Sequence, residues 1–387
     1  MDFEVPEEAR MLTDLVSKFV RDDLMPYESI ILEREANGGH VALTEQELAP
    51  LYVKCKSLGL WGLDVPEALG GANVGLVAKL GVQEALATTV TPFLFPPDSP
   101  NLHMLNAVAN DDQRERYLAP YAAGDTVSAI AISEPNAGGD PAGMATRAVR
   151  KGDDWVINGR KIWISRIKGA DFTIVMAVTD PEKGSRGGIT AFLVDKDTPG
   201  MIIEREIKML GGRRTYEVVF DDCRVPHAQV LGEVGNGFAP MQLRLNTRRI
   251  EMGATALGMS QRALDMLIEH AKNRITFGER LADRQAIQFW ISDAATRMHA
   301  LRLMVWDAAW KVERGEDVRN ECSMIKYFST EMASDIIDRA MQVHGAMGVT
   351  KELPLHLMWQ NVRTMRVYEG PTEVHKWVIA RRILKAS

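Results

Sequence analysis

The chain has 387 residues, of which 46% are hydrophobic and 25% are charged, a composition typical of globular proteins. At roughly 100–200 residues per domain, this length predicts two or three domains. The formal net charge of −6 gives no support for a nucleic-acid-binding protein, which would carry a basic face. The three cysteines are far apart and form no C-x-x-C, which argues against a disulfide framework and a thiolate zinc site. No signal peptide and no membrane-spanning apolar run is evident, so we expect a soluble, cytoplasmic protein that binds neither membrane nor nucleic acid.

Helical periodicity dominates the first third of the chain. Apolar residues with helical spacing occupy 7–25, where Pro6 is placed to start the helix and Pro26 to stop it. Similar patterns recur over 44–58, 75–90 and 100–118. We therefore predict an N-terminal helical domain over residues 1–120.

Near residue 120 the pattern changes to that of short β-strands. Residues 128–133 alternate small and apolar side chains, and 155–165 reads as two strands around Asn158-Gly159, a strong hairpin signal. Further strands are expected over 172–178, 189–194, 201–207 and 216–225. Short strands at near-regular spacing predict a small barrel or sandwich, which we assign to residues 121–232.

From about residue 237 the helical period returns and holds to the end of the chain. The expected helices are 237–272, 284–314, 319–344, 352–366 and 372–385. Long helices with short connections indicate an antiparallel bundle, which we assign to residues 233–387. The fold class is therefore mainly α with a middle β domain.

Several common motifs are missing from the sequence. It has no G-x-x-x-x-G-K-[ST], no G-x-G-x-x-G between a strand and a helix, no H-E-x-x-H and no G-x-S-x-G. A phosphate loop, a Rossmann fold, a zincin site and an α/β-hydrolase site are therefore not supported, and we predict no metal site. The 20 methionines are expected to fill the core.

Two strand ends could bind a flat ligand. Residues 128–140 run from a strand, with Ser133 at its end, into a loop of small residues that allows close approach of a ligand. An ordinary turn would explain this segment equally well. Trp163-Ile164-Ser165 ends another strand with an indole and a hydroxyl, which could bracket an aromatic cofactor or could cap a β core.

Glu369 lies in a break between two expected helices, between Tyr368 and Gly370 and close to Pro371. Partial burial there would raise the pKa of its carboxylate and make it a better base near neutral pH. A solvated loop glutamate is the alternative interpretation.

Taken together, these segments resemble one family, the acyl-CoA dehydrogenases, over nearly the whole chain. The segments that carry the resemblance are 130–140, 155–165, 208–213 with 220–226, 230–238, Arg274-Ile-Thr-Phe-Gly278 with Gln285, 342–348, and Tyr368-Glu-Gly370 with 379–381. Ordered motifs with proper spacing are more specific than any one of them. The resemblance implies an N-terminal helical domain, a β-barrel-like domain and a C-terminal four-helix bundle, the order that the pattern predicts.

The resemblance also implies FAD as cofactor, bound without a Rossmann fold. Ile132, Ser133, Trp163 and Ser165 would contact the flavin, with Ser165 placed near N5 or O4, where negative charge develops. Positions that would hold the FAD of a neighbouring subunit or reach across that interface are Arg274, Thr276, Phe277, Gln285, Gln342, His344 and Gly345. Glu373 is also expected to bind the cofactor. An FAD site shared between subunits implies a homo-oligomer, either a dimer or a dimer of dimers, that is, a homotetramer.

The implied reaction is α,β-desaturation of an acyl-CoA thioester, as in fatty-acid β-oxidation. Glu369 would remove the α-proton while the β-hydride passes to flavin N5, and its backbone N–H and a flavin ribityl hydroxyl would polarise the thioester carbonyl. Electrons would pass to electron-transfer flavoprotein. Gly139, Arg248 and Gly370 match positions close to the substrate.

Some family members carry the base on the first long C-terminal helix. The matching position is Thr247, which cannot act as a base, so Glu251 is the nearby rival. Leu245 replaces an aspartate that many members use to hold CoA, and Gly139 replaces a common serine. These departures leave the acyl group undefined. The alternative functions are an acyl-CoA oxidase, a flavin monooxygenase or nitroalkane oxidase, and a non-catalytic flavoprotein subunit.

Overall fold

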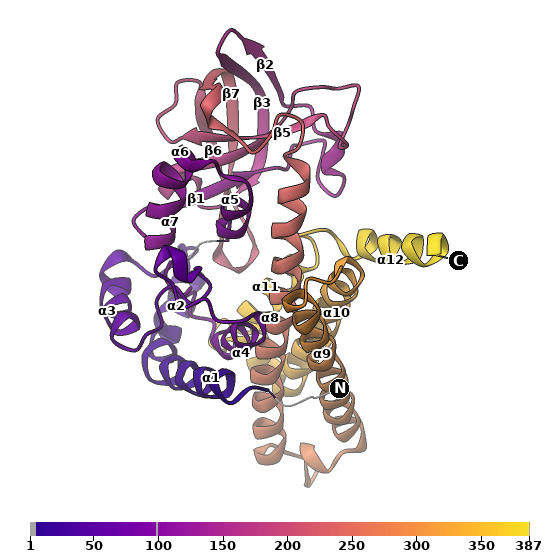
Figure 1. Ribbon diagram of the computed structural model, residues 1–387. Helices are drawn as coiled ribbons and strands as arrows, with labels where there is room; N and C mark the ends of the chain where they lie inside the picture. Colours follow the sequence, from indigo (N-terminus) through magenta and orange to yellow (C-terminus); the bar gives the residue numbers. More distant parts are fainter. Residues whose placement is uncertain (1–4, 98–99, 387) are drawn as a thin grey trace.

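The computed structural model describes residues 5–97 and 100–386. The β-sheet, which comes between two helical regions in the sequence, forms one end of the molecule, and the two helical regions pack beside each other below it (Figure 1). The N-terminal region consists of helices connected by irregular segments. Its helices are α1 (Glu7–Phe19), α2 (Glu28–Ala36), α3 (Glu45–Ser57), α4 (Leu76–Leu86), α5 (Leu102–Val108), α6 (Asp111–Gln113) and α7 (Ala119–Ala123). In the part of the chain that the structure describes, no helix has both the length and the apolar character to cross a membrane.

Two of the expected N-terminal helices have different bounds. The chain does not stop being helical at Pro26, because the π-helical turn Val20–Leu24 and the 3₁₀ turn Met25–Tyr27 lead directly into α2. Pro26 lies in the first turn of that 3₁₀ segment, where its missing N–H costs no hydrogen bond. The segment expected to form one helix over 100–118 is divided into α5, α6 and a π-helical turn at Arg114–Leu118.

The middle region is an eight-stranded sheet. Its strands are β1 (Ser128–Ala131), β2 (Arg147–Lys151), β3 (Asp154–Ile164), β4 (Phe172–Val178), β5 (Ile189–Asp195), β6 (Met201–Lys208), β7 (Arg214–Pro226) and β8 (Val230–Leu231). Their order is β6-β7-β3-β2-β4-β5-β8, and β1 pairs in parallel with β4. Strands β4 and β5 are buried along nearly their whole length, so this sheet has a core of its own.

The hairpin expected at Asn158-Gly159 is wrong. Strand β3 runs without a turn through both residues, and its register with β7 shifts between Ile157 and Gly159. A Cβ at Gly159 would lie 2.6 Å from Cα of Thr146, so glycine is needed for close approach of two backbones. The Asn158 side chain exchanges two hydrogen bonds with Asp222 on β7, at 3.0 and 2.8 Å, so the dipeptide marks a β-bulge.

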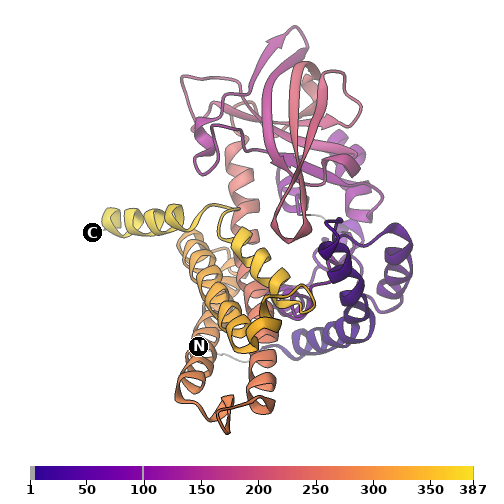
Figure 2. The ribbon, with the colours of Figure 1, turned by 180° about the vertical axis from the view of Figure 1, so that it is seen from behind.

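The C-terminal region is a bundle of long helices with one helix projecting from it. Its elements are α8 (Phe238–Asn273), the short hairpin β9 (Ile275–Thr276) and β10 (Glu279–Arg280), α9 (Gln285–Glu313), α10 (Arg319–His344), α11 (Leu355–Met365) and α12 (Thr372–Ala386). Figures 1 and 2 both show α12 extending away from the body of the molecule.

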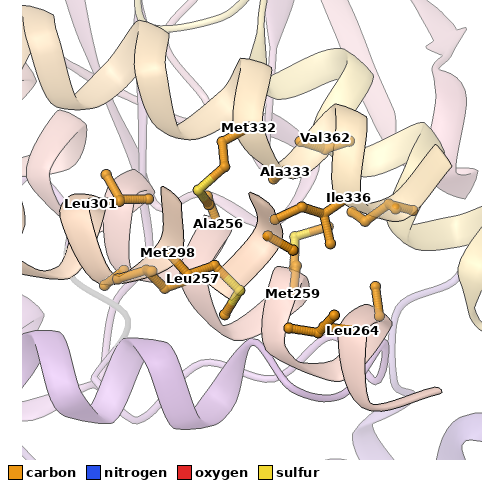
Figure 3. Close-up of a cluster of buried hydrophobic side chains, with 14 of the residues drawn as sticks. Ala256, Leu257, Met259, Leu264, Met298, Leu301, Met332, Ala333, Ile336 and Val362 are labelled. Atoms are coloured by element: carbon orange, nitrogen blue, oxygen red, sulfur yellow. The ribbon is translucent and has the colours of Figure 1, made fainter. Parts of the chain in front are cut away.

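The bundle core forms where α8, α9, α10 and α11 meet, and Figure 3 shows its closely packed side chains. Met259, Met298 and Met332 are among these buried residues, in the core-filling role expected for methionine. Helix α8 also packs against α4 of the N-terminal region. A Cβ at Gly258 would lie 2.0 Å from the carbonyl oxygen of Glu84, so the two helices approach closely only because this residue is glycine.

Candidate active site

Glu369 lies in the short connection between α11 and α12. Its φ of +56° is unusual for a residue with a side chain, and Gly370 follows with a φ of +96°. A Cβ at Gly370 would lie 2.8 Å from Nε2 of His375, so both the conformation and the space require glycine. The Glu369 side chain is only 17% exposed, and its Oε1 lies 3.6 Å from Nη1 of Arg244 on α8. The carboxylate therefore faces α8 and is not a solvated loop glutamate.

Three side chains from other elements hold this connection in place. Arg249 on α8 and His375 on α12 both donate to the carbonyl oxygen of Glu369, from Nε and Nε2 respectively, each at 3.1 Å. Lys326 on α10 donates from Nζ to the carbonyl oxygen of Gly370. A left-handed backbone at a residue with a side chain persists only where its surroundings fix it. Helices α8, α10 and α12 together provide that constraint.

The protonation of two of these donors follows from their burial. Burial, together with the nearby charges of Arg249 and Lys326, lowers the pKa of His375 to about 4, so the ring is neutral at pH 7. Because its Nε2 faces a carbonyl oxygen, the proton of the neutral ring is on that nitrogen. Burial and the charge of Arg249 lower the pKa of Lys326 to about 8, so Lys326 is still predominantly charged at pH 7.

Glu251, the rival carboxylate, lies in a different environment. It is 3% exposed and accepts from Lys79 on α4 at 2.7 Å and from Arg248 at 2.5 Å. Burial raises the pKa of Glu251, but these two cations outweigh it and hold the pKa at about 2. A carboxylate that is so strongly stabilised in its charged form is a poor acceptor for a substrate proton. Its geometry therefore argues for an ion pair that links α4 to α8.

A cavity that is open to solvent lies between the N-terminal helices and α8. Its wall comes from α4, from the segment around Leu94, from α5 and from one face of α8. The polar part of the wall includes Asp64, Lys79, His103, Arg244, Thr247, Arg248 and Glu251. Arg244 reaches from this wall toward Glu369, so the cavity and the carboxylate are adjacent. The predicted substrate residue Arg248 lies in the same wall.

The structure brings the four predicted flavin contacts to one edge of the sheet. Ile132 and Ser133 follow β1, while Trp163 and Ser165 lie at the end of β3. Ser133 and Ile162 are joined by a hydrogen bond of 2.9 Å from the Ile162 N–H to the Ser133 carbonyl. Trp163 has a φ of +63° and is 49% exposed, which leaves its indole open to a ligand.

A buried ion pair holds this edge of the sheet in position. Lys161 is fully buried and donates from Nζ to Glu134 at 2.8 Å and to the carbonyl oxygen of Ile132 at 2.9 Å. Burial lowers the pKa of Lys161 to about 8, although Glu134 acts in the opposite direction. Glu134 also accepts from the backbone N–H groups of Ala145 and Thr146, at 2.6 and 2.9 Å. The chain carrying Ile132 is thereby fixed in position.

The loop that follows β1 also reaches the Glu369 connection. A Cβ at Gly139 would lie 3.5 Å from Pro371 and from Val374, so the backbone at Gly139 passes close to the residues after Glu369. The predicted substrate residues Gly139 and Gly370 therefore lie in adjoining segments. The β edge, the connection and the cavity form one continuous region.

The remaining predicted FAD residues are not brought to this region together. The β9–β10 hairpin lies at the opposite end of α8 from the sheet (Figure 1). The hairpin and the residues that flank it include Arg274, Thr276, Phe277 and Gln285. Helix α8 has 36 residues, which at 1.5 Å per residue is about 50 Å of helix. Gln342, His344 and Gly345 lie at the end of α10, where His344 stacks on His270 with ring centroids 4.4 Å apart. Glu373 is in the first turn of α12.

The most informative residues around Glu369 were not found from the sequence. Arg244, Arg249, Lys326 and His375 contact the connection or its carboxylate, and none of them was predicted as a site residue. His375 lies at helical spacing from the apolar residues Val378 and Ile379, and a titratable side chain on an apolar helix face is a signal of function. That signal could have selected His375 but not Lys326, whose neighbours at helical spacing are mostly polar: Cys322, Ser323, Ser329 and Thr330.

Models of three acyl-CoA dehydrogenase domains match the chain: the N-terminal domain over residues 6–125, the middle domain over 129–223 and the C-terminal domain over 235–384. The chain therefore belongs to the acyl-CoA dehydrogenase family, a family of FAD-binding proteins. It is an oxidoreductase that acts on the CH–CH bond of an acyl-CoA.

Individual relatives cover almost the full length. The chain is 41% identical to (R)-benzylsuccinyl-CoA dehydrogenase of Thauera aromatica, over 99% of this chain and 97% of that protein. It is 33% identical to the caffeyl-CoA reductase-Etf complex subunit CarC of Acetobacterium woodii, over 98% and 99%. The solved structure of butyryl-CoA dehydrogenase from Megasphaera elsdenii superimposes with a TM-score of 0.87 at 29% identity, covering 99% of this chain and 100% of that one.

Proposed function

We propose that this protein desaturates an acyl-CoA thioester between its α- and β-carbons, with Glu369 as the base and FAD as the cofactor. The observation that carries the proposal is the Glu369 connection. Its carboxylate is turned inward beside the cavity, and donors from three helices fix its backbone. A general base must be held within hydrogen-bonding reach of the proton it removes. Such positioning is what this arrangement supplies.

The residues of the sheet edge fit a flavin. The half-exposed indole of Trp163, the hydroxyls of Ser133 and Ser165, and the small-residue loop after β1 offer an aromatic face, hydrogen bonds and room for a planar ring. When bound, FAD supplies the acceptor for the β-hydride. Glu369 takes the α-proton on its carboxylate. The backbone N–H of Glu369, which has no hydrogen bond within the described residues, is available to the thioester oxygen.

Electron-transfer flavoprotein is the proposed redox partner, because the relative CarC is named as part of a complex with Etf. We further propose that Arg274, Thr276, Phe277, Gln285, Gln342, His344, Gly345 and Glu373 act on the FAD of a second copy of the chain. The length of α8 supports this, since it separates most of these residues from the flavin contacts of the same chain. A cytoplasmic location, a homotetramer and a role in fatty-acid β-oxidation stay predictions.

The test is an anaerobic titration of the purified holoenzyme with a panel of acyl-CoAs, following the absorbance of the oxidised flavin. At least one class of thioester should bleach the flavin absorbance of the wild type. E369Q should retain FAD and lose about 10²–10⁴-fold in bleaching rate, the usual contribution of a positioned base. E352Q removes an exposed carboxylate shortly before α11 and should bleach like the wild type. An E369Q variant that keeps most of its rate would contradict the role of Glu369, and a protein that binds no FAD would contradict the cofactor.

A further inference from the structure

The cavity beside Glu369 is unusually rich in charge. Binding pockets for small molecules are lined mainly by apolar side chains with a few polar groups. Here six of the lining residues are ionisable: Asp64, Lys79, His103, Arg244, Arg248 and Glu251. Phe95, Val82 and Leu63 contribute an apolar part of the wall. A purely hydrocarbon acyl group would leave these charges facing a ligand that cannot interact with them.

Four of the charges compensate one another. Lys79 bridges Asp64 at 2.6 Å and Glu251 at 2.7 Å, and Arg248 contacts Glu251 at 2.5 Å. Burial lowers the pKa of Lys79, but the two carboxylates outweigh this effect and raise it, so Lys79 is charged. Two cations therefore face two anions. Burial and the charge of Lys79 lower the pKa of His103, so it is neutral near pH 7 and adds no charge.

Among the wall residues that the structure describes, Arg244 is the cation that this network does not include. It lies one helical turn before Arg248 on α8 and is 9% exposed. Its Nε donates to Oδ1 of Asn101 at 2.7 Å, and Asn101 is in turn fixed by its own bond of 2.8 Å to Ser128. The terminal nitrogens make no hydrogen bond within residues 5–97 and 100–386. Within the described ranges, their ion-pair partner is Glu369, with 3.6 Å between Nη1 and Oε1.

This partner is withdrawn during the proposed reaction. When Glu369 accepts the α-proton it becomes neutral, and Arg244 then has no carboxylate partner among the residues that the structure describes. An unpaired buried charge is costly. A second anion that arrives with the substrate would keep Arg244 paired throughout, and a guanidinium anchored at Nε presents its two terminal nitrogens to a carboxylate.

We propose that Arg244 binds a free carboxylate on the acyl group, so that the substrate is the mono-CoA thioester of a dicarboxylic acid. The inference rests on the proposed function of Glu369. It also restricts where the carboxylate is attached. Glu369 must contact the α-proton, and Arg244 is 3.6 Å from Glu369, so the carboxylate lies within a few bonds of the α-carbon. Succinyl- and glutaryl-type acyl groups meet this requirement, including those that carry an apolar substituent.

The test compares matched thioesters that differ in one charge: glutaryl-CoA with pentanoyl-CoA, and benzylsuccinyl-CoA with 2-benzylbutanoyl-CoA. The charged member of one pair should reduce the flavin of the wild-type holoenzyme with a kcat/KM at least tenfold higher than that of its uncharged partner. R244M should lose about ten- to a hundredfold with that substrate, the range expected for a charge-assisted pair. With the uncharged partner R244M should lose clearly less, so that the ratio of kcat/KM between the paired substrates falls by about ten- to a hundredfold. R244K, which keeps the charge, should recover part of the loss.

R262M is the matched control, because Arg262 lies on the same helix, is partly exposed and is not part of the cavity wall. It should leave the ratio between paired substrates unchanged. Binding to the E369Q holoenzyme gives a readout without turnover, and there the charged thioester should bind at least tenfold more tightly than its partner. R244M in the E369Q background should remove this difference.

Two results would overturn the inference while the proposed function stands. One is a wild type that uses both members of each pair equally well. The other is an R244M variant that loses equally on both, which would show that Arg244 acts through Glu369. If no thioester bleaches or binds the holoenzyme, the desaturation itself fails and the inference falls with it. If the E369Q holoenzyme still prefers the charged thioester, but no thioester bleaches the flavin of the wild type, then the carboxylate is recognised and the proposed desaturation is wrong.

Discussion

The two halves of the candidate site differ in how much of each is completed by a single chain. Glu251 in the cavity wall, and Lys326 and His375 at the Glu369 connection, are nearly inaccessible and are held by partners from other elements of the same chain. Among the residues predicted to bind FAD, Trp163 is 49% exposed and Phe277 is 99% exposed. A single chain therefore completes the acid–base half of the site, that is, Glu369, the residues that hold its connection, and the cavity wall. We infer that the cofactor half is completed by FAD and a second copy.

The physical reason for the difference is the cost of burying charge. A buried charge must have its partner in place as soon as the chain folds, because an unpaired one costs several kcal/mol. The residues near the β9–β10 hairpin are exposed to water and have no such requirement. Substitutions in the acid–base half should therefore lower the stability of the single chain at any protein concentration. Substitutions in the cofactor half should have effects that depend on protein concentration.

The largest effect is expected from E251Q. This change removes a buried anion between Lys79 and Arg248, two cations of the cavity wall whose side chains are 15% and 35% exposed. Breaking a fully buried ion pair on one side costs about 3–5 kcal/mol, and we expect the lower end of that range here because solvent reaches both cations. Urea unfolding should show this loss in the midpoint at both low and high protein concentration, because the pairing is within one chain.

E269Q is the matched control, since Glu269 is an exposed glutamate on the same helix. It should unfold like the wild type. An E251Q protein of wild-type stability would show that the cavity wall does not depend on the ion pairs seen here, and the argument that Arg244 is the surplus cation would lose its basis.

A pH dependence of intermediate size is expected from His375. Its folded-state pKa of about 4 lies below the ordinary value of 6.5. Between these values the unfolded chain binds a proton that the folded chain does not, so stability falls as the pH falls from about 6.5 to 4. The full shift corresponds to about 3 kcal/mol. H375Q keeps a donor for the Glu369 carbonyl but cannot titrate, so it should lose less stability over the same range.

Thermal unfolding at several pH values would measure this difference. H299Q, which changes an exposed histidine on α9, should follow the wild-type pH profile. If wild type and H375Q lose stability in parallel between pH 6.5 and 4, the buried ring is not the source of acid sensitivity.

The contrast between the halves also explains what could be predicted from sequence. Periodicity located most helices and strands, because an amphipathic face repeats along the chain. It failed at Asn158-Gly159, because the same dipeptide suits a hairpin and a bulge, and only the approach of Thr146 decides between them. Family motifs pointed to Glu369, Trp163 and Ser165, whose neighbours along the chain belong to the same pattern.

Residues that act across the fold had no such signal. Arg249, Lys326 and His375 meet at one backbone turn from three different helices, and no spacing in the sequence relates them. A role for Arg244 could be inferred only from the charged residues that surround it in the structure. Tertiary contacts of this kind can be inferred from sequence as buried polar positions, but their partners cannot.

The smallest effect, and the one that separates the two halves most directly, is expected from F277S. Phe277 is 99% exposed in the single chain and has a φ of +51° at the tip of the β9–β10 hairpin. If a second copy covers it, burial of the ring contributes about 1.5–3 kcal/mol, and its loss should weaken association about tenfold or more. Because FAD would be held by both copies, F277S should release flavin on dilution and leave urea unfolding of the chain unchanged. Mass measurement and flavin absorbance over a dilution series would test this, with V53S as the control, since Val53 is an exposed apolar residue on α3. A wild type that stays monomeric and keeps its FAD would show that one chain completes both halves, and the difference between them would then reflect only the cofactor.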